Sequence, residues 1–282
     1  MFNLFSKMRL ATSVALLTVS TSVVAWDDCC DPCDTSRTYI GVFGGGLWSD
    51  STRITQMGTA FFPEGTPVFG PLDIVAEGRT KKKSTGFAGV QLGYEWSQTP
   101  CFGSCSGWTI APAFEIEAFF FRKKISAHLV NDPGITRLTE HDFEDSFKMK
   151  AGVLMVNALV SFNSSCMYGF TPYVGGGIGA ARISLKDADS LQVSPPEPGI
   201  NHFNSRRDDS CWAFAAQAKA GLRYNFCGGW HVFGEYRYLF VDNSNYVFGS
   251  TVYPAHVPTS PWNVKLHNTN HNAFVAGIQF DL

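Results

Sequence analysis

The segment His271-Asn-Ala-Phe-Val-Ala-Gly-Ile-Gln-Phe-Asp-Leu282 ends the chain and decides the fold. Its even positions from 274 onward carry Phe, Ala, Ile, Phe and Leu, and the odd positions between them carry Val, Gly, Gln and Asp. A period of two is that of a β-strand. A strand with an apolar face needs apolar surroundings, and each of its backbone edges needs a partner. Closure of a barrel against the first strand supplies both partners.

Seven earlier segments are alternating or rich in β-forming residues, so the sequence predicts eight strands. The clearest pair flanks the tight turn Cys227-Gly-Gly229. In the segment 147–162 the apolar residues move from odd to even positions near Gly152, which predicts a β-bulge there. The first strand has apolar residues on both faces, so its outward face stays open. The predicted strands are 38–48, 86–96, 108–121, 147–162, 172–181, 214–226, 230–240 and 271–282.

The connections between these strands alternate in length. Three are short, and four are long, polar and rich in Pro and Gly, namely 49–84, 122–145, 185–210 and 241–270. Single-chain outer-membrane barrels have an even number of strands, short periplasmic turns and longer outer loops. The predicted fold class is therefore all-β: an eight-stranded antiparallel transmembrane β-barrel with four long extracellular loops and three short periplasmic turns.

Charged residues share one face of the predicted strands, opposite a face of Phe, Leu, Ile, Val, Tyr and Ala. They are Glu115, Glu117, Lys219, Arg223, Glu235 and Arg237. A soluble barrel such as a lipocalin would place its charges outside. If lipid surrounds the barrel, these six side chains form a charge network inside it. Aromatic residues at strand ends fit a membrane girdle: Trp48, Trp96, Trp108, Phe162, Phe226, Trp230 and Phe240.

The N-terminus predicts export. Lys7 and Arg9 precede an apolar run, 10–24, that ends before Ala25, as in a secretory signal peptide cleaved after that residue. The predicted domains are the signal peptide 1–25, a Cys-rich segment 26–36 and the barrel 37–282. Without Lys7 and Arg9 the chain has 20 basic and 24 acidic residues, a net charge of −4, so no nucleic-acid partner is expected.

The predicted mature chain keeps all eight cysteines: Cys29, Cys30, Cys33, Cys101, Cys105, Cys166, Cys211 and Cys227. In an exported protein disulfides are the default, although spacing does not determine the pairing. The pair Cys30-Asp-Pro-Cys33 has the spacing of a redox or metal site, but no βαβ pattern surrounds it, so the structural interpretation is favoured.

With these strands in place, the chain resembles the eight-stranded outer-membrane barrels of Gram-negative bacteria, the OmpA-like and opacity-protein-like barrels. The glycine-rich strand Pro172-Tyr-Val-Gly-Gly-Gly-Ile-Gly179 supports the resemblance. So does the C-terminal pattern of Gly277, Phe280 and Leu282, which is similar to the family's assembly signal, although many members end in Phe. The resemblance implies a location in the outer membrane, membrane lipid as surroundings and the barrel assembly machinery as a partner.

Family members act as structural proteins, adhesins and surface antigens, and less often as small pores or lipid-modifying enzymes. Eight strands leave an interior that side chains just fill, and buried charges must be paired, so a solid core is favoured over a polar path. His256, His267 and His271 lack metal-ligand spacing, and no Ser–His arrangement can be assembled. We therefore expect no catalytic, cofactor-binding or metal-binding residues. The expected role is structural or in adhesion and host interaction through the long loops; the alternative is a small-solute pore or a lipid-modifying enzyme.

Overall fold

A computed structural model describes residues 36–65, 69–100, 107–134, 136 and 138–282. The chain divides into two units, Met1–Asp31 and Pro32–Leu282. The first unit lies outside the described residues. The signal peptide 1–25 and the domain boundaries therefore stay predictions, and so does the Cys-rich segment, of which only Ser36 is described.

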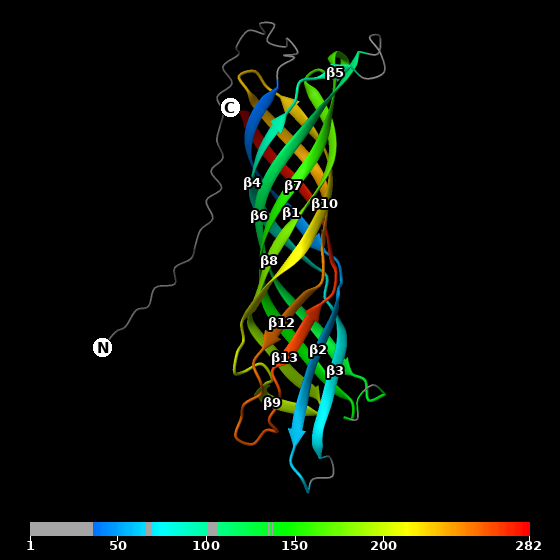
Figure 1. Ribbon diagram of the computed structural model, residues 1–282, viewed down its shortest axis with the longest axis vertical. Helices are drawn as coiled ribbons and strands as arrows, with labels where there is room; N and C mark the ends of the chain where they lie inside the picture. Colours follow the sequence, from blue (N-terminus) through cyan, green and yellow to red (C-terminus); the bar gives the residue numbers. More distant parts are fainter. Residues whose placement is uncertain (1–35, 66–68, 101–106, 135, 137) are drawn as a thin grey trace, which may run out of the picture. The chain divides into compact units, whose positions relative to one another are not determined.

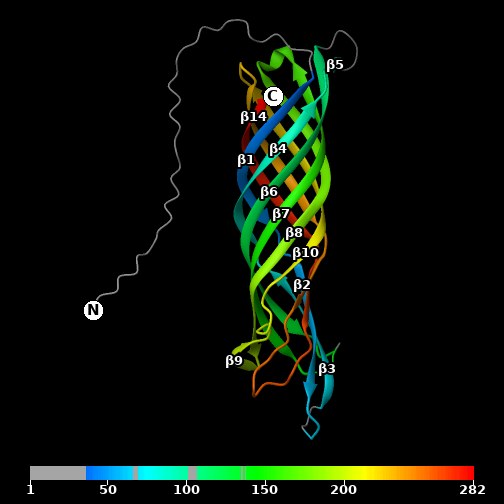
Figure 2. The same cartoon turned by 60° about the vertical axis from the view of Figure 1, so that its left-hand side comes forward.

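Eight strands form a closed antiparallel ring (Figures 1 and 2). The ring follows the chain order, and β1 closes it by pairing with β14, from Tyr39 opposite Asp281 to Ser49 opposite His271. The predicted eight-stranded antiparallel barrel is thus confirmed. The strands of the ring are β1 (Arg37–Ser49), β4 (Lys83–Glu95), β6 (Trp108–Asn131), β7 (His141–Ser164), β8 (Phe170–Ser194), β10 (Asp209–Asn225), β11 (Trp230–Val241) and β14 (Thr269–Asp281).

The outward side chains are apolar in the half of the ring nearer the short turns. On β1, Ile40 and Val42 are about half exposed, whereas Tyr39 and Phe43 are buried inside, so the even positions of the first strand face outward. The same outward face on the other strands exposes Val90, Leu92, Phe114, Ile116, Leu154, Val156, Val174, Ile178, Phe214, Leu222, Val232, Phe274 and Ile278. A closed ring with such a surface satisfies its backbone internally and suits a lipid bilayer.

The predicted aromatic girdle lies largely on this outer surface. Trp48, Trp96, Trp108, Phe226 and Trp230 are exposed, and Phe162 and Phe240 are half-buried. Within the described residues, no helix is long and apolar enough to cross a membrane.

The four connections predicted as long loops are in the predicted positions, but each contains strands. The segment 49–84 folds into the hairpin of β2 (Arg53–Phe62) and β3 (Gly70–Thr80). The segment 122–145 is mostly the ends of β6 and β7, 185–210 holds the end of β8 with β9 (Pro196–Asn201), and 241–270 holds β12 (Ser244–Phe248) and β13 (Trp262–Leu266).

We call the described residues of 50–82, 122–151, 182–211 and 242–268 the head. Figure 1 shows it opposite the short turns, where β5 (Thr99–Pro100) and the 3-10 turn Ser165–Met167 lie.

The head continues the wall of the barrel. β6, β7 and β8 pass from barrel to head without a break. At β1, β4, β11 and β14 the passage is interrupted once, at 50–52, 81–82, 242–243 and 267–268. On the head side of β4, before its first residue Lys83, β3 pairs with β6 in place of β4. There β13 also pairs with β2. The pairing of the barrel strands therefore fixes where each hairpin of the head begins.

The head has an aromatic core of its own. The rings of Phe147, Phe203 and Phe248 stack with centroids 4.8 to 6.0 Å apart. Trp262 is fully buried beside them, and its ring meets that of Phe143 at 6.2 Å. Burial of large aromatic side chains is a major source of stability, so the head is a folded part of the protein.

The outward face of the strands changes from polar to apolar where the head meets the barrel, and β7 shows this best. From Phe143 to Ala151 its inward odd positions are mainly apolar and its outward positions include Glu144 and Lys148. From Leu154 onward the outward positions are apolar. The bulge predicted near Gly152 is wrong, because β7 pairs with β6 in one continuous register. The outward residues differ in the two parts because water surrounds the head and lipid surrounds the barrel.

Candidate functional site

The six charged residues predicted to form an interior network all lie inside the barrel and are at most 5% exposed. Lys219 reaches from β10 to β6, where its Nζ contacts Glu115 and lies 3.4 Å from Oε2 of Glu117. Arg237 of β11 binds the other side of Glu117, with Nη2 3.0 Å from Oε2, and also contacts Glu235. The three carboxylates and two cations thus form one chain of ion pairs.

Neutral polar groups complete this chain. Tyr39 donates its hydroxyl to Glu115 at 3.0 Å, and Tyr173 donates to Glu235 at 2.7 Å. Gln217 donates to Glu117 and to Oδ1 of Asn157, the latter at 2.7 Å. A buried charge is tolerated when it is paired and its remaining lone pairs are satisfied, and these four residues perform that role.

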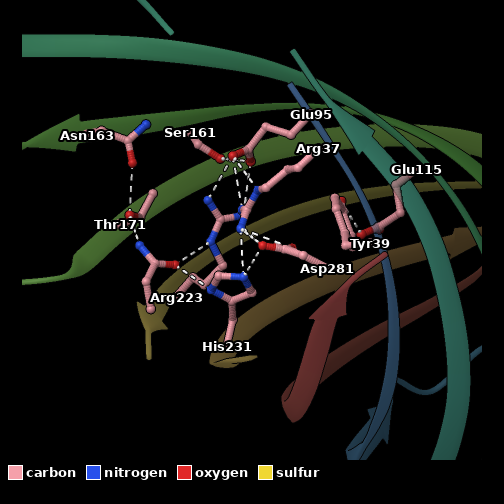
Figure 3. A network of polar contacts seen from close by, with 11 residues as sticks. Arg37, Tyr39, Glu95, Glu115, Ser161, Asn163, Thr171, Arg223, His231 and Asp281 are labelled. Atoms are coloured by element: carbon pink, nitrogen blue, oxygen red, sulfur yellow. Dashed lines mark hydrogen bonds and ion pairs between the residues drawn. The ribbon is translucent and has the colours of Figure 1, made fainter. Parts of the chain in front are cut away.

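A second cluster lies towards the short turns (Figure 3). There Arg223, the sixth predicted residue, forms a two-bonded pair with Glu95, at 3.0 and 3.1 Å. Arg37 also binds Glu95, with Nη2 3.0 Å from Oε1, and its Nη1 lies 3.3 Å from Asp281. His231 contacts Asp281 at 2.9 Å and Asn225 at 2.8 Å. This cluster ties the start of β1 to the end of β14.

These side chains fill the interior. The cavity between the two clusters, lined by Tyr39, Glu115, Tyr173 and Arg223 among others, has a volume of about 10 Å³, roughly what one water molecule requires. The polar and charged side chains thus pack closely at this level of the barrel.

Alternation predicted which face these residues share but not their partners. Glu95, Arg37, His231 and Asp281 were missed, although the alternation places Glu95 and His231 on the same polar face. Arg37 and Asp281 lie at the two ends of the barrel sequence, and only closure of the ring brings them together. Pairing of the first and last strands was predicted, but not the register that sets Arg37 near Asp281.

The predicted assembly signal lies on β14 and just after it. Phe280 faces outward and its ring packs on that of Trp230 at 4.8 Å. Gly277 faces inward, where an added Cβ would lie 2.5 Å from the ring of Phe233. Leu282 is exposed. Recognition of these residues by the assembly machinery stays a prediction.

The predicted disulfide cysteines fall into two groups. Cys29, Cys30, Cys33, Cys101 and Cys105 lie outside the described residues. Among the described ones, Cys166 has an exposed thiol and Cys211 a half-buried thiol, neither of them in a disulfide, and the disulfide pairing stays a prediction. Cys227 is exposed. Burial raises the pKa of the Cys211 thiol, so it reacts slowly at neutral pH.

Cationic side chains gather on the outer surface where the barrel meets the head. Arg122, Lys150 and Arg182 point outward from β6, β7 and β8 directly above the apolar surface. The guanidinium of Arg182 lies 5.7 Å from the ring of Trp212. Lys, Arg and Trp side chains are typical of the membrane–water interface, so this row marks the border of the bilayer.

A further buried acid lies in the head. Asp145 of β7 is 1% exposed, and burial raises its pKa to about 7. The amide of Gln56, oriented to satisfy its neighbours, donates to both carboxylate oxygens at 3.1 and 2.9 Å and accepts from Ser190 at 3.3 Å. A proton on Asp145 removes the cost of a buried charge, so this group makes the head sensitive to pH.

A closed ring of eight strands, an apolar outer surface and a filled, charged interior define a bacterial outer-membrane β-barrel. The protein is therefore located in the outer membrane, with lipid around the barrel.

No protein-family model and no curated protein matches this chain. Among solved structures it is similar to the outer membrane protein OprG from Pseudomonas aeruginosa, with a TM-score of 0.46, 13% identity and coverage of 88% of this chain and 98% of that one. It is also similar to Neisserial surface protein A, with a TM-score of 0.38, 11% identity and coverage of 87% and 97%. For Ail of Yersinia pestis the values are 0.28, 12%, 86% and 99%.

Proposed function

We propose that this protein is a surface protein of the outer membrane whose barrel anchors the head, and that the head contacts macromolecules outside the cell in an adhesion or host-interaction role. The observation that carries the proposal is the filled barrel interior. The ion pairs of Glu115, Glu117 and Arg223 occupy the barrel interior, so the role of the barrel is to attach the protein to the membrane. Contact with molecules outside the cell is then the role of the head.

The packing of the head supports the same role. An adhesive surface binds better when it is ordered in advance, because ordering a loop on binding costs free energy. Here the hairpins are strands that share a core around Trp262, and they continue the barrel wall.

The best contact point is the tip of the β2–β3 hairpin. This hairpin reaches farthest from the ring (Figure 1). Near its tip Phe61 is 48% exposed and Phe69 is 65% exposed. Exposed aromatic side chains at a protruding position are typical anchors of protein interfaces.

Two measurements test the proposal. Cells displaying the wild-type protein should bind host cells or extracellular matrix, and Phe61→Ser/Phe69→Ser should reduce binding at least tenfold. Val252→Ser, which removes an equally exposed apolar side chain elsewhere on the head, should not. The purified protein should give no stepwise conductance in planar bilayers. Stepwise conductance with no cell binding would favour the small-solute pore instead.

A further inference from the structure

Three side chains that the sequence keeps apart meet in the head. Glu197 lies on β9, His202 follows that strand, and His256 belongs to the segment between β12 and β13. Oε2 of Glu197 lies 3.5 Å from Nε2 of His202 and 3.2 Å from Nε2 of His256. All three ligand atoms lie within 4.8 Å of one another. Sequence spacing predicted no metal site, because His202 and His256 come from different hairpins.

The other nitrogen of each ring is already engaged. Nδ1 of His202 lies 3.0 Å from the backbone oxygen of Ser190, and Nδ1 of His256 lies 2.6 Å from that of Val257. A carbonyl oxygen only accepts hydrogen bonds, so each Nδ1 carries the hydrogen and each neutral ring has its lone pair on Nε2. Metal-binding histidines are commonly oriented by this hydrogen bond from the second nitrogen to a carbonyl.

Three acceptor atoms therefore face one another. The two Nε2 lone pairs and the Glu197 carboxylate repel unless a cation or a proton on each ring lies between them. His202 is 3% exposed, and its ring is enclosed by those of Phe143 at 5.3 Å and Trp262 at 5.8 Å. Its Nε2 thus has a fixed position. Among the described residues, no Lys or Arg forms an ion pair with Glu197.

The distances suit a single ion. Zinc binds His nitrogen and carboxylate oxygen at about 2.0–2.2 Å in a tetrahedron, which places two ligand atoms roughly 3.3 Å apart. The separations of 3.5 and 3.2 Å lie on either side of that value. We infer that Glu197, His202 and His256 form a binding site for a divalent cation of the zinc type, with a fourth position open to water.

Such an ion would cross-link two parts of the head. Glu197 and His202 hold the β8–β9 hairpin, and His256 holds the segment between β12 and β13. Direct hydrogen bonds already join these parts: Tyr253 accepts from the backbone of Asn201 at 3.1 Å, Thr251 donates to the backbone of His202 at 3.0 Å, and Asn204 and Val252 exchange two bonds of 2.7 and 2.9 Å. Because the ion would bind only the folded arrangement, it would stabilise the head.

The test uses the full mature chain, folded in detergent micelles, with its cysteines alkylated so that thiolates do not bind the metal. After removal of metal with EDTA, Zn²⁺ is titrated calorimetrically. The wild type should bind one equivalent, and Glu197→Gln and His256→Asn should lose it. His128→Asn is the matched control, because His128 faces a single carboxylate, that of Asp142 at 3.7 Å. This control should still bind one equivalent.

Folding of each variant is checked by its heat-dependent gel mobility, and cleavage within 249–261 by a non-specific protease gives a second readout. Zn²⁺ should slow this cleavage at least tenfold in the wild type and leave it unchanged in folded His256→Asn. Equal zinc binding by the wild type and His256→Asn would overturn the site. Absence of binding by the wild type would overturn it too, and would mean that protons hold the cluster together.

Discussion

Arg37, the first residue of β1, and Asp281, the last residue of β14, form an ion pair with Nη1 3.3 Å from Oδ1. The pair closes the seam of the barrel. Its members are 19% and 27% exposed, so water screens the attraction. The side chain of Arg223, which binds Glu95 in the same cluster, is only 6% exposed.

This difference in exposure predicts unequal effects. Arg223→Gln should lower the free energy of unfolding by about 3–5 kcal/mol, because it removes the two-bonded partner of the buried Glu95. Arg37→Gln should cost about 1 kcal/mol or less. Urea unfolding in lipid vesicles measures both values. Equal losses would contradict the distinction between the seam and the interior.

The Glu115→Gln/Glu117→Gln double variant should destabilise the barrel by a similar 3–5 kcal/mol, because it leaves the ammonium of Lys219 without a carboxylate partner. The control is Glu144→Gln, which changes an exposed acid of the head and should stay within about 0.5 kcal/mol of wild type. Unchanged stability of the double variant would refute the structural role of the interior network.

Acidification should stabilise the head. The pKa of Asp145 is raised to about 7 from an ordinary value of 3.8. Between these values the folded state holds the proton more often than the unfolded state, so the contribution is greatest below pH 4 and is lost as pH rises through 7. Asp145→Asn should remove this pH dependence of stability. At pH 8 the free energy of unfolding of the variant should exceed that of the wild type by a few kcal/mol. Thermal unfolding of the head from pH 4 to 8, followed by tryptophan fluorescence, checks it; parallel profiles for both proteins would disprove it.

The change of the outward face of β7 from polar to apolar predicts where lipid begins. Ala158 and Ser146 lie on the outward face of this strand, on either side of the border. Ala158→Arg should destabilise by about 2–4 kcal/mol, because a charge in the middle of the lipid-facing band is costly. Ser146→Arg should change stability by about 0.5 kcal/mol at most. The comparison uses unfolding in vesicles, and a costly Ser146→Arg would shift the border into the head.

The four long connections are predicted to lie outside the cell. Trypsin added to intact cells should cut first at the exposed residues 81–83, between β3 and β4. Arg206 and Arg207 should be cut more slowly, since their side chains bind backbone oxygens of Val247 and Ala188.

An impermeant maleimide should label Cys211 only slowly, because its thiol pKa is raised, and should not reach the exposed Cys166 at the short turns. Fast labelling of Cys166 would reverse the topology.

The sequence predicted the barrel well and the head poorly for one physical reason. Lipid imposes an apolar face on each spanning strand, so alternation is strong from Leu154 to Val160. In β2 and β3 the buried residues, such as Ile54 and Ile74, are few, and the exposed ones include both polar residues and the apolar Met57 and Phe61. Their pattern is that of a short soluble strand, which resembles a loop when Pro and Gly flank it.

The interior site shows a similar limit. Alternation selects a face of each strand, so Glu115, Glu117 and Lys219 could be placed inside together. Which carboxylate meets which cation depends on the register between strands distant in the chain, as for Arg223 and Glu95. Glu197 and His256 meet through the docking of two hairpins, and no local pattern encodes that contact.

Because β7 runs without a break from head to barrel, it restricts which insertions and deletions the protein can accept during evolution. Inward residues occupy the odd positions in both halves, so adding or deleting a single residue between Phe143 and Leu154 would turn either the aromatic core of the head towards water or the polar Asn157 and Ser161 towards lipid. Insertions or deletions in this segment must therefore involve two residues, or a β-bulge must restore the alternation. β8 shows the second solution: its pairing with β7 slips between Ser146 and Lys148, where Asp187 has a positive φ of 50°. Changes in the size of the head are thus expected at the ends of hairpins, where the alternation of one strand does not constrain the next.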